Sequence, residues 1–317
     1  MNPLKNRIIT VNGPPEGYYV SNLSKRIDSS EFKVKKYQPD DIESKKALEE
    51  ANLLIAFPGK IIIDKKMLRA AKNLEFIHFL SVGYDNIDLE TASKLKIPVA
   101  NNPGWPSISV AEHTIMLILM TLKQATLMYT KTVQNAWKGE GYPPRYELRG
   151  KTLGLLGLGS IGQEVARQAK GFEVNIIYHK RNRLTPSEEA ALDVGYRSFD
   201  ELLKESDVLS IHVPLTDETR DIIGNDELSK MKESAVVVNT SRKEVVNEEA
   251  VFDALDCGRL FGFGTDFTPD RSLTGLENVC MTPHSSVTPE AMMRMAAQGF
   301  DNISRFLKGE KPLYIVN

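Results

Sequence analysis

The clearest chemical signature in the chain is a set of three glycines, Gly157, Gly159 and Gly162, in the spacing G-x-G-x-x-G. An apolar run at 153–158 leads into them, and a helix-like segment at 163–170 follows. In a dinucleotide site the first glycine permits a tight turn, the second lets the backbone approach a pyrophosphate, and the third lets helix and strand pack closely. The alternative is a glycine-rich turn with a purely structural role. The surrounding strand–helix–strand pattern favours the dinucleotide site.

Basic residues stand where such a site usually carries an acid. A second apolar run, 174–178, ends close to Lys180, and Arg181 and Arg183 follow with no acid between residues 179 and 184. An Asp or Glu at this point binds the adenosine ribose of NAD, whereas Lys and Arg pair with the 2′-phosphate of NADP. The sequence therefore predicts NADP(H) in preference to NAD(H). A solvated basic turn is the alternative.

Two further side chains follow apolar runs and suit acid–base chemistry on a carboxylate substrate. Arg242 comes after the run 235–239 and Thr240, and its planar fork can bind a carboxylate through two hydrogen bonds. His284 comes just after the run 279–281 and can act as a general acid near neutral pH. Taken singly, each residue can instead have a purely structural role. Arg242 can cap a turn, and His284 can be a histidine whose hydrogen bonds are satisfied within the protein.

A candidate anion-binding site lies in the first third of the chain. Ser81, Val82 and Gly83 end an apolar run, and the N–H groups of Val82 and Gly83 can form a nest for an anion such as a carboxylate. A strand-ending turn with Gly83 at positive φ explains the same residues.

Alternating strands and helices must position these side chains. Strands are expected at 7–11, 32–37, 52–57, 75–81, 98–100, 207–213, 235–239, 261–267 and 279–281. Helices are expected at 67–71, 89–95, 199–203, 226–231, 248–255 and 291–307, and one long helix from Ser107 or Ser109 to about Gln134. This order predicts an α/β fold with parallel sheets covered on both faces, whose ligands bind at the carboxyl ends of the strands.

Composition limits the class of protein. The chain has 317 residues, 41% of them hydrophobic and 26% charged, and a net charge of −2. These values are typical of a soluble enzyme of two domains, and they suggest neither nucleic acid nor a membrane as partner. The two cysteines predict reduced thiols, the first residues lack the apolar run of a signal peptide, and the expected location is the cytoplasm. No metal site is predicted.

Six segments together resemble the D-isomer-specific 2-hydroxyacid dehydrogenases, which include glyoxylate, hydroxypyruvate and phosphoglycerate dehydrogenases. They occur in the family's order: SVGYDNIDLETA, NNPGWPSISVAEH, GLLGLGSIGQEVA, HVPLTDETRDIIG, VVVNTSRKEVVNEEA and CMTPH. The resemblance implies two Rossmann-like, doubly wound domains with the active site in the cleft between them. Residues 1–102 with 288–317 would form a flavodoxin-like substrate-binding domain, and residues 103–287 the dinucleotide-binding Rossmann domain.

The resemblance also implies roles for particular residues. Arg242 would bind the substrate carboxylate and carbonyl oxygen, and His284 would exchange the proton. Ser81, Val82 and Gly83 would hold the carboxylate. The cofactor would be bound by Gly157, Gly159, Ser160, Ile161, Gly162, Lys180, Arg181, Arg183, His212, Pro214, Thr219, Thr240 and Asp266. A homodimer would form through the long helix after Pro106.

The chain departs from the family pattern at three places. Lys243 replaces the usual glycine after the arginine, and HIGG is replaced by a segment that begins His284-Ser285-Ser286. GLDVFEPEP is replaced by GTDFTPDRS, so the glutamate that orients the catalytic histidine is missing. Its place falls on Arg271, which leaves the adjacent Asp270 as the candidate partner of His284.

Two functions are compatible with these residues. The first is an NADP(H)-preferring reductase of small 2-keto acids of the glyoxylate or hydroxypyruvate kind. The second is a non-enzymatic dinucleotide sensor, since the C-terminal binding protein corepressors resemble this family. Loss of the glutamate favours the sensor, and retention of Arg242 together with His284 favours the enzyme.

Overall fold

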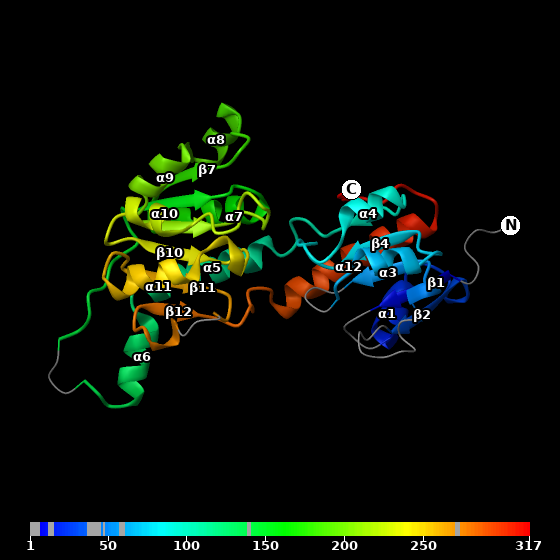
Figure 1. Cartoon of the computed structure of the whole chain (residues 1–317), viewed down its shortest axis with the longest axis horizontal. Helices are drawn as coiled ribbons and strands as arrows, with labels where there is room; N and C mark the ends of the chain where they lie inside the picture. Colours follow the sequence, from blue (N-terminus) through cyan, green and yellow to red (C-terminus); the bar gives the residue numbers. More distant parts are fainter. Residues whose placement is uncertain are drawn as a thin grey trace. The chain divides into compact units, whose positions relative to one another are not determined.

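The computed structural model describes residues 7–11, 16–36, 46, 48–56, 61–137, 141–269 and 273–317. The chain divides into two compact units (Figure 1). Unit 1 comprises residues 1–106 and 289–317, and unit 2 comprises residues 107–288.

Unit 1 contains a parallel five-stranded sheet in the order β2-β1-β3-β4-β5. Its strands are β1 (Arg7–Val11), β2 (Phe32–Lys36), β3 (Leu53–Ala56), β4 (Phe76–Phe79) and β5 (Val99–Ala100). Its helices are α1 (Glu16–Leu23), α3 (Lys65–Ala70), α4 (Leu89–Lys94) and α12 (Pro289–Leu307), with the short 3₁₀ helix η1 (Ser29–Glu31).

Both faces of this sheet are buried. Because side chains alternate along a strand, Leu53 and Ile55 of β3 face one cluster, which contains Phe300 of α12, while Leu54 and Ala56 face the other. Helices α1 and α12 cover the first face, and α3 and α4 cover the second. Two buried faces explain why the inner strands β3 and β4 read as largely apolar runs, LLIA and FIHF.

Unit 2 contains a parallel seven-stranded sheet in the order β12-β11-β10-β9-β6-β7-β8. Its strands are β6 (Thr152–Leu156), β7 (Asn175–His179), β8 (Gly195–Tyr196), β9 (Val208–Ile211), β10 (Val236–Asn239), β11 (Gly262–Thr265) and β12 (Val279–Met281). Its helices are α5 (Ser107–Leu122), α6 (Ala125–Val133), α7 (Ser160–Ala169), α8 (Pro186–Leu192), α9 (Phe199–Glu205), α10 (Asn225–Lys230) and α11 (Glu248–Asp256), with the 3₁₀ helices η2 (Lys170–Phe172), η3 (Lys243–Val245) and η4 (Leu273–Gly275).

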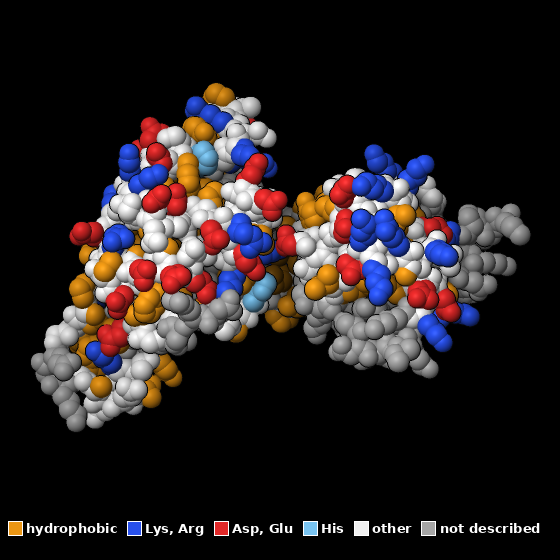
Figure 2. All heavy atoms as spheres, in the orientation of Figure 1, with side chains coloured by type: hydrophobic (Ala, Val, Ile, Leu, Met, Phe, Trp, Pro, Cys, Tyr) orange, Lys and Arg blue, Asp and Glu red, His pale blue; other side chains and the backbone are white. Residues whose placement is uncertain are grey.

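The unit 2 sheet is also covered on both faces. One cluster joins alternate strand residues such as Leu209 and Val237 to α9, α10 and α11, and the other joins Val208 and Val236 to α5 and α7. The predicted α/β class with parallel sheets is confirmed in both units. In the space-filling view, acidic and basic side chains are interspersed over the visible face of unit 2 (Figure 2). Within the described ranges, no helix combines the length and apolar character needed to cross a membrane.

The single long helix predicted after Pro106 is wrong. The structure has two helices, because Gln124 adopts a left-handed conformation with φ of 50° and interrupts the hydrogen-bond ladder after Leu122. The apolar stripe continues on both sides of the break, so the pattern of Met and Leu residues does not reveal it. The second helix contacts β12, where the Thr126 hydroxyl lies 3.2 Å from the Cys280 sulfur.

Candidate active site

The glycine turn connects β6 to α7, and two of its glycines are required by space. Gly157 has a φ of 95°, and a Cβ added there would lie 2.7 Å from the backbone oxygen of His212. A Cβ added to Gly162 would lie 2.4 Å from the backbone oxygen of Gly157. Both contacts are far shorter than van der Waals contact, so the turn folds this tightly only with glycine at these positions.

The middle glycine, Gly159, borders open space in front of α7. Gly159 is the N-cap of α7, and a Cβ added there would meet no heavy atom within 4 Å beyond its neighbours. Open space in front of a ten-residue helix gives a pyrophosphate access to unpaired N–H groups and to the positive end of the helix dipole. Ser160, which is exposed, and Ile161, which is half-buried, form the first turn beside this space. These residues fit a dinucleotide.

The basic residues after β7 have different surroundings. The Lys180 ammonium lies 3.5 Å from the backbone oxygen of Leu158, at the glycine turn. Arg181 is 82% exposed and makes a 3.1 Å ion pair with Glu218, which is also exposed. Such an exposed pair is weak, and an incoming anion can replace it.

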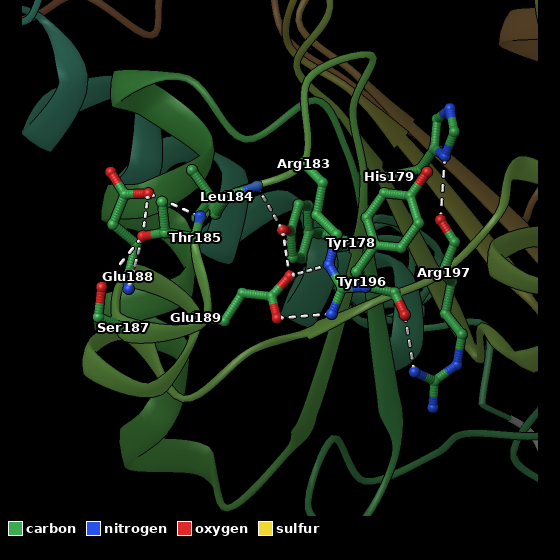
Figure 3. A network of polar contacts seen from close by, with 10 residues as sticks. All are labelled: Tyr178, His179, Arg183, Leu184, Thr185, Ser187, Glu188, Glu189, Tyr196 and Arg197. Atoms are coloured by element: carbon green, nitrogen blue, oxygen red, sulfur yellow. Dashed lines mark hydrogen bonds and ion pairs between the residues drawn. The ribbon is translucent and has the colours of Figure 1, made fainter.

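Arg183, in contrast, is held by a network inside the turn (Figure 3). Its Nε and Nη2 atoms donate to the two carboxylate oxygens of Glu189 at 2.8 and 2.9 Å, and its guanidinium lies 5.0 Å from the ring centre of Tyr196. The Tyr178 hydroxyl also donates to Glu189, at 2.6 Å, and accepts the N–H of Leu184. The bonds from Arg183 and Tyr178 lower the pKa of Glu189 to about 2. This network fixes the shape of the turn.

The residues after β9 lie against the glycine turn. The His212 N–H donates to the Leu156 oxygen at 2.7 Å, and its ring nitrogen Nε2 lies 2.8 Å from the Ser210 hydroxyl. Burial lowers the pKa of His212 to about 4, so the ring is neutral at pH 7. Farther along, the Thr219 hydroxyl donates to the Pro214 oxygen at 2.6 Å and closes a turn.

After β10 a compact turn presents Arg242. The Asn239 side chain donates to the Arg242 oxygen at 2.8 Å and accepts the Ser241 N–H at 3.0 Å, which fixes the backbone. The Arg242 Nη1 donates to the Ser241 oxygen at 2.7 Å, and the side chain is half-buried. Thr240 is turned into the protein, with its hydroxyl 2.9 Å from that of Thr114 on α5.

Asp266, directly after β11, is a buried carboxylate that organises the segment after β12. It accepts hydrogen bonds from the Thr282 hydroxyl at 2.6 Å and from the N–H groups of Ser285 and Ser286 at 2.9 Å each. The His113 ring lies 3.4 Å away. Burial by itself would raise the pKa of Asp266, but these hydrogen bonds outweigh it and hold the pKa well below its usual value. Asp266 is therefore ionised.

His284 lies within this segment. It has a φ of 56°, in the left-handed region, and its N–H donates to the Thr282 oxygen at 3.0 Å. Its side chain is exposed, with the ring 5.0 Å from that of Phe267 in an edge-to-face arrangement. Asp270, the predicted partner, and Arg271 lie outside the described residues, so that pairing stays a prediction.

In unit 1 the predicted anion nest follows β4. The Ser81 hydroxyl donates to the Gly83 oxygen at 2.6 Å, and the oxygens of Val82 and Ser81 accept from the Asn101 side chain and the Asn102 N–H. These carbonyls are engaged within the unit, whereas the N–H groups of Val82 and Gly83 make no hydrogen bond to another described residue. Gly83 does not have a positive φ, so this strand end does not use the left-handed conformation that glycine allows.

The unit 2 candidates share one edge of the sheet. They follow the carboxyl ends of β6, β7, β9, β10, β11 and β12, and in a parallel sheet these ends lie on the same side. The structure thus brings together a glycine turn, a basic turn, an arginine and a histidine that the sequence places up to about 130 residues apart.

Comparison with known proteins identifies the family. The family model for the D-isomer specific 2-hydroxyacid dehydrogenase, NAD binding domain, matches residues 115–286. A glyoxylate reductase of Aeropyrum pernix is 39% identical over 297 residues, 89% of this chain and 88% of that protein. The chain belongs to the D-isomer-specific 2-hydroxyacid dehydrogenases. A second relative, a glyoxylate reductase of Thermococcus litoralis, is 40% identical over 267 residues, 80% of each chain.

Solved structures agree with this assignment. The crystal structure of a glyoxylate reductase from Paecilomyes thermophila superposes with a TM-score of 0.87 at 30% identity and covers 98% of each chain. This 2-hydroxyacid dehydrogenase is accordingly an NAD(P)-dependent enzyme that transfers a hydride between a nicotinamide cofactor and a 2-hydroxy or 2-keto acid. The family and the enzyme class predicted from the six segments are confirmed, and the enzyme is favoured over the sensor.

Two polar residues around the candidate site, Glu189 and His113, are absent from the residues that the sequence predicts. Glu189 lies on α8, which was not predicted although Thr185-Pro186-Ser187-Glu188 carries the signal of a capped helix, and that capping box is present. No local signal points to a role for His113, because its partners Thr282 and Asp266 are more than 150 residues away along the chain.

Proposed function

We propose that this dehydrogenase reduces small 2-keto acids of the glyoxylate and hydroxypyruvate kind. The observation that carries the proposal is that Arg242 and His284 both follow carboxyl ends of strands in the unit 2 sheet, on the side that also bears the glycine turn. The relatives from Aeropyrum pernix and Thermococcus litoralis, both named glyoxylate reductases, support the substrate class.

In this proposal each side chain has one task. The Arg242 guanidinium binds the substrate carboxylate and polarises the carbonyl oxygen, and the N–H groups of Val82 and Gly83 bind the carboxylate as well. The nicotinamide, when bound, supplies the hydride. The His284 imidazolium gives its proton to the carbonyl oxygen, on which negative charge develops, and takes it back in the oxidation of the hydroxy acid.

The cofactor would be held by the glycine turn and by the residues that surround it. Backbone N–H groups of Ser160 and Ile161 would bind the pyrophosphate. The rest of the groove would be lined by His212, Pro214 and Thr219, with Thr240 behind them. Asp266 would lie on the nicotinamide side.

We propose further that NADPH is preferred to NADH. Lys180 and Arg181 support this, since one lies at the glycine turn and the other is exposed in a weak ion pair. Arg183 already engages both oxygens of Glu189, so we assign it the task of shaping the turn around the 2′-phosphate rather than the main contact to it.

An initial-rate panel followed at 340 nm tests both proposals. Glyoxylate, hydroxypyruvate, pyruvate and a branched 2-keto acid are each reduced with NADPH and with NADH. The expected result is the highest kcat/KM for glyoxylate or hydroxypyruvate, and a lower KM for NADPH than for NADH. Preference for the branched acid would refute the substrate class, and equal KM values for the two cofactors would refute the cofactor preference.

The proposed assembly is a homodimer formed through α5 and α6. Exposed apolar side chains on these helices support it: Ile108, Met116, Tyr129 and Val133 are 49%, 38%, 71% and 66% exposed. Sedimentation equilibrium would test the assembly. Both cysteines, Cys257 and Cys280, are free thiols, which supports a cytoplasmic location.

A further inference from the structure

Helix α5 contacts the segment that carries His284 at two points. Its Ser109 hydroxyl donates to the Ser286 oxygen at 2.6 Å and accepts the Thr288 N–H at 3.0 Å. One turn further along, the His113 Nε2 lies 2.8 Å from the Thr282 hydroxyl oxygen. Residues four apart lie on the same face of a helix, so Ser109 and His113 hold the two ends of one short segment.

The hydrogen bonds at His113 have a fixed direction. The Thr282 hydroxyl gives its only proton to Asp266, at 2.6 Å, so its oxygen can only accept from His113. His113 therefore carries a proton on Nε2 and donates it. The result is a chain of donors that runs from His113 through Thr282 to the carboxylate of Asp266.

Asp266 accepts hydrogen bonds from residues on both sides of His284 and so fixes the backbone there. Thr282 precedes His284 by two residues, while Ser285 and Ser286, which donate their N–H groups to Asp266, follow it directly. Between these anchors His284 has a φ of 56°, a conformation that residues other than glycine seldom adopt unless their surroundings impose it. The surroundings that impose it here are Asp266 and α5.

We propose that His113 and Ser109 are positioning residues that set the place of the His284 ring by fixing the segment from Thr282 to Thr288. The inference rests on the proposed role of His284 as proton donor. Neither residue touches the substrate in this proposal. His113 acts through Thr282 and Asp266, and Ser109 acts through the backbone of Ser286 and Thr288.

The kinetic test compares variants that remove a donor with variants that keep it. His113→Ala and Thr282→Val lose the hydrogen bond, whereas His113→Gln and Thr282→Ser keep a donor or hydroxyl at similar reach. We expect kcat for keto-acid reduction to fall about ten- to a hundredfold in the first pair, since small displacements of a reacting group have effects of this size. The KM for the keto acid should stay within about threefold, because Arg242 binds the carboxylate. The second pair should recover most of kcat.

A control variant and a second measurement complete the design. Glu112→Gln changes an exposed neighbour of His113 on the same helix and should leave kcat unchanged. Hydrogen exchange of the peptide that spans residues 282–288, measured by mass spectrometry, reports the segment without any substrate. Exchange should be faster in His113→Ala and Thr282→Val than in the parent, in Glu112→Gln and in the two rescue variants.

Each outcome decides the proposal. Unchanged exchange in His113→Ala shows that α5 does not hold the segment and overturns the inference. Faster exchange with unchanged kcat shows a structural brace without a role in positioning, and also overturns it. If His284→Gln keeps the parental rate, the proposed function of His284 fails, while the exchange result still decides whether His113 fixes the segment.

Discussion

Protonation of the buried His78 should destabilise unit 1 in mild acid. His78 lies on β4, its Nε2 is 2.9 Å from the Asn102 Oδ1, and Asn102 uses its own amide N–H to donate to the Met295 oxygen. His78 must therefore donate from Nε2. The other ring nitrogen faces the Asn302 amide nitrogen at 3.4 Å, which is a donor, so a second ring proton has no acceptor there.

The size of the effect follows from the pKa. Complete burial lowers the pKa of His78 from 6.5 to about 4, against a smaller opposite effect of the Asn102 hydrogen bond. The unfolded chain binds a proton near pH 6.5 and the folded chain does not, so stability is fully present above pH 6.5 and is lost as the pH falls toward 4. A shift of this size corresponds to about 3 kcal/mol, with a slope of up to about 1.4 kcal/mol per pH unit.

Urea unfolding at pH values from 4 to 7, followed by circular dichroism, measures this slope. The variant His78→Gln keeps a polar side chain but does not titrate in this range. Its baseline stability will be lower, and its unfolding free energy should depend less steeply on pH, by up to about 1.4 kcal/mol per unit. His212, whose pKa is also lowered to about 4, lies in unit 2 and is present in both proteins, so it contributes equally to both slopes. Identical slopes in parent and variant would refute the assignment of a neutral, desolvated His78.

Three further predictions concern the active site. Arg242→Ala should lower kcat/KM for glyoxylate at least a hundredfold, and His284→Gln should lower kcat by about a hundredfold with cofactor affinity retained; steady-state kinetics and fluorescence titration measure these effects, and parental rates in both would reject the assigned roles. Arg181→Ala should raise the Kd of NADPH about tenfold and leave the Kd of NADH unchanged, whereas Arg183→Ala and Glu189→Gln should raise both Kd values by similar factors. Calorimetry measures these Kd values. A selective loss of NADPH binding in Arg183→Ala would make Arg183 the direct ligand of the 2′-phosphate. Gly162→Ala should weaken dinucleotide binding at least about tenfold and lower Tm, because its Cβ would lie 2.4 Å from the Gly157 oxygen. Gly171→Ala serves as the control, because a Cβ at that position would meet no heavy atom within 4 Å. Equal affinities in these two variants would contradict the steric argument.

The sequence predicts well those features that depend on local pattern. Strands buried on both faces appear as short apolar runs, and the glycine spacing marks a turn whose geometry allows few alternatives, so β6, α7 and β7 were found close to their observed bounds. The break at Gln124 was missed because one left-handed residue does not disturb an apolar stripe.

Features that depend on distant partners could not be predicted. The sequence does not distinguish the three basic residues of the turn, Lys180, Arg181 and Arg183. Only the fold shows that Arg183 is bound by Glu189. His113 is similar, because its hydrogen-bond partner Thr282 is 169 residues away and comes to it only when α5 packs beside β12. Local pattern therefore gives the elements, and tertiary contact determines what each polar side chain does.

The composition of unit 1 from two separate stretches of chain has a consequence for synthesis on the ribosome. Helix α12 supplies Phe300, Ile303 and Leu307 to the core that covers one face of the first sheet, yet all of residues 107–288 are translated before it. At about 5–20 residues per second, that sheet waits roughly 10–40 s with an apolar face uncovered, whereas unit 2 is continuous and can fold as soon as it emerges. Nascent unit 1 is thus the part of this dehydrogenase most in need of a chaperone, and a chain truncated before α12 should aggregate.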